Sequence, residues 1–335
     1  MLNEQNIQLT SAELSQIWSA YQNDTMMRCL LRYFLNHVDD DEIRSVLDYA
    51  LQLAQTHLEQ LTAIFEAEGN AVPQGFTDDD VNVTAPRLYS DTFILAYVQQ
   101  SAKLAMNSYS MSVALAARQD IHAYFSQCMR DVLELHRMAN EVLLSKGLYT
   151  RSPNIPYQDQ VTFADSQQYL RGWWGTQRPL LSVEIANLFD NAQRNALGRA
   201  TMMGFSQVAL SKEVGKYMVR GKEIAAKHVE IFNSALRSDD LQAPMTWDYE
   251  VTTSTQAPFS DKLMMFQTTA LIAIGMGYYG TAMATSMRRD LAAKYSRLMA
   301  EIGKYAEDGA NIMIRKGWLE KPPQQADRSA LANND

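Results

Sequence analysis

The stretch that decides the fold occurs twice, as "KGLYTRSP" at Lys146–Pro153 and as "KGWLEKPP" at Lys316–Pro323. Each copy places a lysine in a last helical turn, then a glycine, then a proline a few residues later. Glycine accepts the left-handed backbone conformation and proline cannot continue a helix, so this pattern predicts a helix end. Two such ends 170 residues apart indicate two copies of one helical unit.

The residues before the two helix ends align with each other. Residues 89–148 give 12 identities in 60 positions at an offset of 170, and residues 9–65 give 10 in 57 at an offset of 171. This similarity indicates a tandem duplication, in which each copy is a domain with its own core. We expect a first bundle, a linker, a second bundle and a disordered polar tail, over residues 9–150, 151–179, 180–323 and 324–335. We also expect Trp173 and Trp174 of the linker to pack between the bundles.

Each copy contains four segments with helical spacing of apolar residues. Thr10 and Glu13 predict a capping box at the first helix. Short connections make helices one and two, and three and four, antiparallel neighbours. The connections between helices two and three, residues 70–89 and 241–259, are long enough to cross a whole bundle. The sequence therefore predicts an all-α protein of two tandem ferritin-like four-helix bundles, each with a long crossover between its second and third helices.

The composition and charge limit which partners and which cellular location we expect for this protein. The formal charge is -8 and no run is rich in lysine or arginine, which argues against nucleic acid as a partner. The N-terminus lacks an export signal, and Cys29 and Cys128 form no Cys-x-x-Cys pair, so we expect a cytoplasmic protein. The uncharged run at residues 263–287 contains polar side chains and its counterpart contains Lys103, so we predict a bundle helix and no transmembrane segment.

A ferritin-like bundle raises the question of a metal centre. Di-iron proteins of this kind carry Glu-x-x-His on two helices, and none of the five histidines here follows a glutamate at that spacing. His57 and His228 are the histidines at equivalent positions, with Glu59 and Glu230 two residues later, and these four residues are the candidate metal ligands. Histidines packed between helices, with the glutamates in solvent, fit the spacing better. We predict no cofactor and no catalytic residue, and leave iron, manganese and zinc open.

Small residues lie in the third helix of the second copy. The string "GMGYYG" at Gly275–Gly280 matches the pattern Gly-x-Gly-x-x-Gly, but it lies inside a helical segment and not after a strand. Small residues here let helices approach closely, or alternatively leave room in the core for an apolar ligand. Four residues at equivalent positions would then lie near the cavity: Met106, Tyr109, Met276 and Tyr279.

The repeated pattern resembles a known family. It combines "HLE" in the second helix, a crossover that ends in "LYSD" or "PFSD", an R-x-D turn and the Lys-Gly helix end. These motifs are similar to those of an uncharacterised ferritin-like family of endospore-forming bacilli with spore-coat-like members. The resemblance covers about residues 9–323. It implies a sporulation-associated or coat-like protein without a known set of catalytic residues.

Two functions remain open at this point. The first, which we favour, is a non-enzymatic structural or interaction protein of spore-coat type that associates with itself or with other proteins. It predicts apolar or aromatic patches on the surface, and incorporation into the spore coat. The second is a metal- or small-ligand-binding bundle, with an oxidase as one form of it, that uses His57 and His228. It predicts carboxylates that converge on buried histidines.

Overall fold

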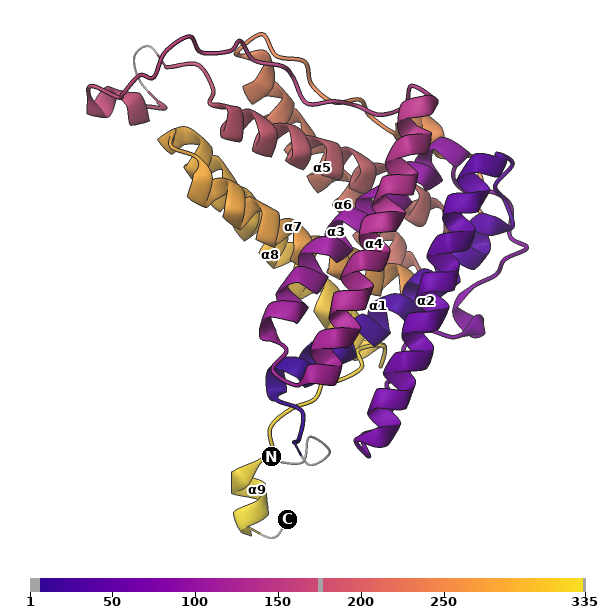
Figure 1. Cartoon of the computed structure of the whole chain (residues 1–335). Coiled ribbons are helices and arrows are strands. Elements are labelled where there is room, and N and C mark those ends of the chain that lie inside the picture. The colour runs from indigo at the N-terminus through magenta and orange to yellow at the C-terminus, as the bar shows by residue number, and fades with distance from the viewer. Residues whose placement is uncertain (1–6, 174–176, 334–335) are drawn as a thin grey trace.

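The computed structural model of the chain describes residues 7–173 and 177–333. These residues form four long helices in each repeat, in the same order, and Figure 1 shows the two repeats side by side. The first repeat contains α1 (Ser11–Leu35), α2 (Asp41–Ala67), α3 (Asp91–Leu115) and α4 (Gln119–Ser145). The second contains α5 (Ser182–Val208), α6 (Lys212–Arg237), α7 (Asp261–Thr285) and α8 (Arg289–Arg315). In the predicted tail, residues 328–333 form a short helix, α9 (Arg328–Asn333).

The helices begin and end where the local chemistry requires. The Oγ1 of Thr10 accepts a hydrogen bond from the Glu13 N–H at 3.2 Å, and the Glu13 carboxylate accepts one from the Thr10 N–H at 2.8 Å. This reciprocal pair satisfies N–H groups that have no partner inside the helix. At the other end of each repeat, Gly147 and Gly317 have φ angles of +68° and +67°, the left-handed conformation that the helix stops require. The predicted capping box and both predicted helix ends are confirmed.

The connections follow the predicted pattern. Short turns join α1 to α2, α3 to α4, α5 to α6 and α7 to α8, which makes four helical hairpins. Long crossovers at residues 68–90 and 238–260 join the hairpins of each repeat. The structure confirms an all-α fold of two tandem four-helix bundles, each with a long crossover between its second and third helices.

The two crossovers pair with each other, which no local pattern in the sequence indicates. Isolated antiparallel bridges join Val81 to Phe259 and Tyr89 to Val251. At the repeat offset of 170, Val81 corresponds to Val251 and Tyr89 to Phe259. Each bridge is therefore the image of the other when the repeats are exchanged. The two bundles are consequently related by a pseudo-two-fold axis that passes between the crossovers.

Side chains repeat this symmetry beside the bridges. The Ser90 hydroxyl donates a hydrogen bond to the Glu250 carboxylate, and the Ser260 hydroxyl donates to Oδ1 of Asp80 at 2.6 Å. The serines are equivalent in the two repeats, and so are the acidic residues. Ser90 and Ser260 also cap α3 and α7, so the same side chains begin helices and join the repeats.

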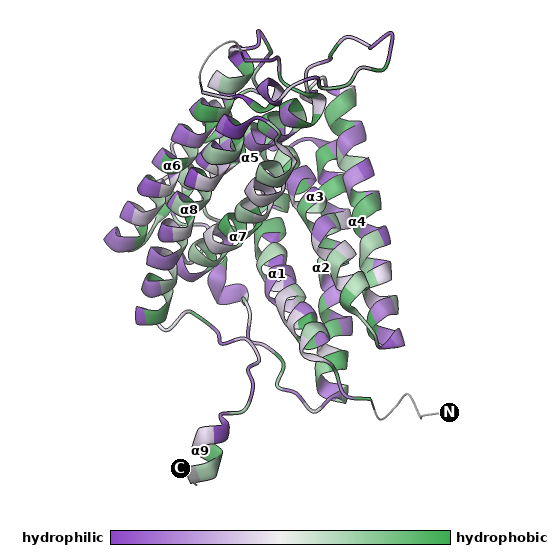
Figure 2. Cartoon of the chain, turned by 90° about the vertical axis from the view of Figure 1, so that its left-hand side faces the viewer, coloured by the Kyte–Doolittle hydropathy of each residue, from purple (hydrophilic) through white to green (hydrophobic). Residues whose placement is uncertain are grey.

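The buried apolar side chains form one large cluster shared by the two repeats and one smaller cluster in each repeat. The largest cluster of buried apolar side chains contains residues from all eight long helices, and therefore from both repeats. Two smaller clusters lie within the first and the second repeat. Figure 2 shows hydrophobic and hydrophilic faces alternating along α6 and α8, as expected of helices with one side packed on a core. Each bundle thus has apolar packing of its own and shares a central core with the other.

The linker runs outside this core. Figure 1 shows it along one edge of the molecule, between the end of α4 and the start of α5. Trp173 is 59% exposed, so it does not pack between the bundles as predicted, while Trp174 lies outside the described residues. The uncharged run forms most of α7, and among the described helices none is both long and apolar enough to cross a membrane.

Candidate functional site

The first buried histidine, His57, lies on the inner face of α2. Its Nδ1 is 3.7 Å from Oδ2 of Asp24 on α1, and its Nε2 is 3.4 Å from Oδ2 of Asp131 on α4. The rings of Tyr109 on α3 and Tyr124 on α4 stand edge-on to the imidazole, with centroids 6.1 and 6.2 Å away. All four helices of the first bundle therefore contribute to the surroundings of this ring.

The two flanking carboxylates favour a charged imidazole. Burial by itself would lower the pKa of His57, but the nearby Asp24 and Cys128 together outweigh burial and raise this pKa. Burial also raises the pKa of Asp24, and the attraction of His57 opposes that shift. Asp131 at the second ring nitrogen adds further support for the positive charge. The arrangement is an imidazolium held between two carboxylates, almost out of contact with water.

The second histidine, His228, is fully buried at the equivalent position of the second bundle. Its Nδ1 lies 2.9 Å from the hydroxyl of Tyr279, and its Nε2 lies 3.2 Å from Oε2 of Glu301. The Tyr279 oxygen also accepts a hydrogen bond from the Asn195 amide at 2.8 Å. Burial lowers the pKa of His228, with Glu301 acting in the opposite direction. With a neutral ring, Nδ1 accepts from the Tyr279 hydroxyl and the Nε2–H donates to Glu301. Every group in the row from Asn195 to Glu301 then has a hydrogen-bond partner.

Two residue differences accompany the opposite pKa shifts of the two histidines, because Cys128, which also raises the pKa of His57, corresponds to Leu298 at the repeat offset of 170. At the repeat offset of 171, Asp24 of the first bundle corresponds to Asn195 of the second. The carboxylate stabilises an imidazolium, whereas the neutral amide binds the tyrosine and supplies no counter-charge. The tyrosines and the acidic residues on the fourth helices are retained, as Tyr109 with Tyr279 and Asp131 with Glu301.

The predicted metal ligands are not brought together. Glu59 on α2 and Glu230 on α6 are exposed, each on the side of its helix away from the buried histidine. Glu230 pairs with Arg237. The carboxylates beside the histidines come instead from the first and fourth helices, which the local spacing around each histidine could not indicate. Over residues 7–173 and 177–333, no three side chains of the His, Cys, Asp and Glu types are arranged so that they could hold a metal ion.

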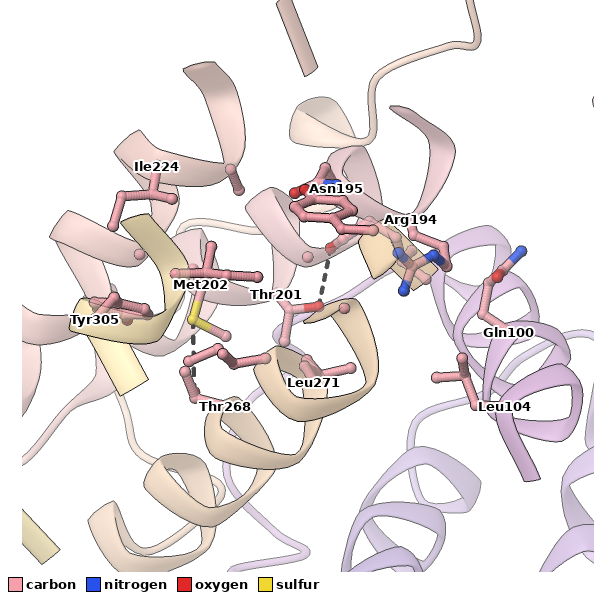
Figure 3. Close-up of a pocket in the computed structure, with 18 of the residues that line it drawn as sticks. Gln100, Leu104, Arg194, Asn195, Thr201, Met202, Ile224, Thr268, Leu271 and Tyr305 are labelled. Atoms are coloured by element: carbon pink, nitrogen blue, oxygen red, sulfur yellow. Dashed lines mark hydrogen bonds between the residues drawn. The ribbon is translucent and has the colours of Figure 1, made fainter. Parts of the chain in front are cut away.

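A cavity of about 130 Å³ lies in the core of the second bundle, and we call it the second-bundle pocket. Its walls come from α5, α6, α7 and α8, and from α3 of the first bundle (Figure 3). The polar side chains in its wall include Arg194, Asn195 and Gln100, and most of the others are apolar or glycine. Such a lining, with few polar groups, is typical of small-molecule sites.

The four residues predicted to lie near one cavity have different surroundings in the structure. Tyr279 lines the second-bundle pocket, together with Gly275 of the glycine-rich string. Met106 lines a different cavity of about 290 Å³, between the two bundles. Tyr109 packs in the core cluster of the first bundle and Met276 against that of the second. Arg194 was missed, although an arginine on a helix face otherwise made of small and apolar residues is a usable signal.

Comparison with known proteins places the chain in a family. The family described as proteins of unknown function, DUF3231, matches residues 1–161 and again residues 168–331, in agreement with the duplication. No curated protein matches. A crystal structure described as a spore coat protein of Bacillus halodurans is 22% identical, with 46% of this chain and 100% of that chain covered and a TM-score of 0.42. The two tandem matches cover nearly the whole sequence, and the chain belongs to the DUF3231 family.

Proposed function

We propose that this protein is a non-enzymatic structural or interaction protein of the spore-coat type, which assembles with further copies of itself through its linker. The observation that carries the proposal is a row of exposed apolar side chains in residues 155–163. Tyr157 is 100% exposed, Val161 is 83% exposed and Phe163 is 90% exposed. Exposed apolar surface of this kind marks interaction sites in folded proteins.

The spacing of these side chains supports an extended mode of binding. Ile155 and Tyr157 are separated by Pro156, and Val161 and Phe163 by Thr162, with the polar residues 158–160 between the two pairs. No helix or strand interrupts residues 151–158 or 161–165, and the chain bends between them at residues 159–160. In an extended chain alternate residues point to the same side, so Ile155 and Tyr157 share one side before the bend, and Val161 and Phe163 share one side after it. A segment of this type can pair with another extended segment and place its side chains in pockets of the partner.

Self-association tests the proposal directly. We expect the wild-type protein to form dimers or larger assemblies at micromolar concentration, measured by sedimentation velocity. The variant Tyr157→Ser/Val161→Thr/Phe163→Ser is expected to sediment as a monomer. The matched control changes the intervening positions, as Gln158→Ala/Gln160→Ala/Thr162→Ala, and should associate like the wild type. A monomeric wild-type protein, or equal association of both variants, would exclude the linker as the interface.

The coat assignment has a separate test. It rests on the sequence motifs that resemble the spore-coat-like family, and we expect a tagged copy produced during sporulation to be found in the extracted coat fraction of purified spores. The linker variant should be depleted from that fraction, while the control variant should be retained. Recovery of the tagged wild-type protein only from the mother-cell cytoplasm would contradict the coat assignment.

The second candidate function is small-ligand binding, and the second-bundle pocket favours it. The geometry gives less support to a metal at the histidines. Both ring nitrogens of His57 face carboxylates on opposite sides, and those of His228 face a hydroxyl and a carboxylate. One metal ion could not use both nitrogens of either ring, so it would have to displace one of these partners.

A further inference from the structure

Two glycines of the second repeat leave space in the wall of the second-bundle pocket. Gly198 corresponds to Met27 at the repeat offset of 171, and Gly275 corresponds to Ala105 at the offset of 170. Both glycines line the pocket, and a Cβ atom added to either would meet no atom within 4 Å. The first repeat has larger side chains at both of these positions.

An arginine lies in the wall of this pocket. The Arg194 side chain is only 10% exposed, and its guanidinium lies over the ring of Tyr278, 3.9 Å from the ring centre. One terminal nitrogen donates to Oδ1 of Asn191 at 2.7 Å, whereas Nε has no hydrogen-bond partner. A guanidinium has five N–H donors and cannot lose its charge in a protein. This side chain is therefore a buried cation with unused donors.

The neighbouring charges leave the cation incompletely neutralised. Asp190 lies 3.9 Å from Nε of Arg194, which is too far for a hydrogen bond, and its other oxygen pairs with Lys103. Two cations thus share one carboxylate, and the group of three carries a net charge of about +1. The equivalent residues of the first bundle, Ser19 and Asn23, carry no charge. Arg194 is therefore a cation that the first repeat lacks at the equivalent position, whereas Lys103 comes from α3 of the first repeat.

The pocket has a polar end and an apolar end. Figure 3 shows Arg194 and Gln100 at one end, on α5 and α3, and Met202, Ile224 and Tyr305 at the other. The Oε1 of Gln100 is buried and has no hydrogen-bond partner. Because this oxygen is an acceptor, it would bind a water molecule or a ligand hydroxyl rather than an anion. The anion-binding group of the pocket is therefore the arginine.

We propose that the second-bundle pocket binds a small monocarboxylate with an apolar body, of the size of benzoate or hexanoate. The carboxylate would accept hydrogen bonds from the guanidinium of Arg194, and the apolar body would lie among the glycines and aliphatic side chains. The cavity of about 130 Å³ limits the apolar body to about one benzene ring, since a cavity of about 150 Å³ lined by apolar side chains holds benzene, and the carboxylate would lie at the Arg194 end. This binding goes beyond the proposed structural role and does not depend on it.

Fluorine NMR with two probes of similar shape tests the proposal. 4-Fluorobenzoate carries the carboxylate and fluorobenzene lacks it. We expect the wild-type protein to bind 4-fluorobenzoate, seen as a shifted or broadened fluorine resonance that unlabelled benzoate reverses. Arg194→Met should weaken 4-fluorobenzoate roughly 10- to 100-fold, the range for loss of a charge-assisted hydrogen bond, and leave fluorobenzene unchanged.

Filling the pocket provides a second, independent variant. Gly198→Met introduces the residue of the first repeat and is expected to abolish the binding of both probes. Gly277→Met is the matched control, because Gly277 is an exposed glycine in α7 that does not line the pocket, and it should bind like the wild type. Thermal melts followed by circular dichroism establish that each variant is folded.

The possible results either support or overturn the proposal. The absence of any 4-fluorobenzoate signal with the folded wild-type protein would overturn it. Equal affinity in the wild type and Arg194→Met would show that the arginine does not bind the carboxylate. Unchanged binding in Gly198→Met would place the ligand elsewhere. None of these results bears on the linker, so failure of this proposal is distinguishable from failure of the structural role.

Discussion

Tyr217 on α6 and Tyr305 on α8 bind one another reciprocally. The hydroxyl of each donates to the backbone oxygen of the other at 3.0 Å, and the rings stack with centroids 4.2 Å apart. Each hydroxyl approaches a glycine on the facing helix. A Cβ at Gly221 would lie 2.3 Å from the Tyr305 hydroxyl, and one at Gly309 would lie 2.3 Å from that of Tyr217. The tyrosines and the glycines therefore require each other.

The first repeat solves the same contact differently. The positions of the two tyrosines are occupied by Val46 and Leu135, and those of the two glycines by Ala50 and Ala139. All four are buried in the first bundle. Val46 and Leu135 are smaller than the tyrosines, so the first bundle has room for alanines where the second bundle has glycines.

Gly221→Ala is expected to destabilise the protein by about 1–3 kcal/mol, because the added methyl group overpacks against Tyr305. Gly198→Ala is the matched control. It also changes a helical glycine in the wall of the second-bundle pocket, but its Cβ meets nothing, so helix propensity should stabilise the protein by about 0.5–1 kcal/mol. Urea unfolding measures both changes in the free energy of unfolding. Destabilisation by both variants would contradict this account of the packing.

Introducing the first-repeat residues at both Gly221 and Tyr305 is expected to recover part of the lost stability. The double variant Gly221→Ala/Tyr305→Leu removes the clashing hydroxyl, so it should be more stable than the sum of the two single changes predicts. The comparison uses the same urea unfolding measurement on all four proteins. Strictly additive effects would mean that Gly221 and Tyr305 do not constrain each other.

The two histidines are expected to give opposite pH dependence of stability. The pKa of His57 is raised on folding, so its contribution is fully present below about pH 6.5 and is lost as pH rises towards the folded pKa. The pKa of His228 is lowered, so its contribution is fully present above about pH 6.5 and is lost as pH falls towards the folded pKa. Each slope is limited to about 1.4 kcal/mol per pH unit for one proton. Urea unfolding of His57→Gln and His228→Gln between about pH 5 and pH 9 measures both.

Exchanging Asp24 and Asn195 between the repeats tests what causes the opposite pKa shifts of the two histidines. Asp24→Asn should lower the pKa of His57, because the counter-charge is lost, and Asn195→Asp should raise that of His228. Titration of the ring resonances by NMR, in protein with labelled histidines, reports each pKa separately. If His57 keeps its raised pKa in Asp24→Asn, the raised pKa depends on Cys128 or Asp131 instead.

Cutting the linker should not separate the repeats. A protease site inserted at residues 158–160 would break the chain in an exposed segment, while the paired crossovers and the shared core still hold the halves together. We expect both fragments to elute together in size-exclusion chromatography at the volume of the uncut protein. A matched sample in denaturant identifies the volumes of the free fragments. Elution as two separate folded fragments would mean that the bundles are independent domains.

Metal content discriminates between the two readings of the buried histidines. We expect the same metal content, by elemental analysis, in the wild-type protein and in His57→Ala/His228→Ala, both produced with added iron, manganese and zinc and without a metal-binding tag. The reason is that each ring nitrogen already has a protein partner. Stoichiometric metal that is lost in the double variant would establish a metal site in the bundles.

Part of the candidate site could be predicted from the sequence and part could not. The equivalence of His57 and His228 is visible in the alignment of the repeats, and their burial is consistent with the helical spacing. Their carboxylate partners come from other helices, at separations of 33 residues for Asp24 and 73 for Glu301, which no local pattern encodes. The pocket could not be predicted from local patterns, because its wall combines α5, which carries Arg194 and Gly198, with Gly275 of α7 and with α3 of the first bundle.

The sequence by itself determined the duplication, the helices and the bundle topology. These features depend on interactions between near neighbours, such as the Thr10 and Glu13 capping box and the left-handed Gly147 and Gly317, and on connection length. Only the tertiary structure decided that the crossovers pair, that the two bundles share a core, and that a cation lines an open pocket in one of them. The physical reason is that burial and charge depend on distances between residues far apart in the chain, which packing alone determines.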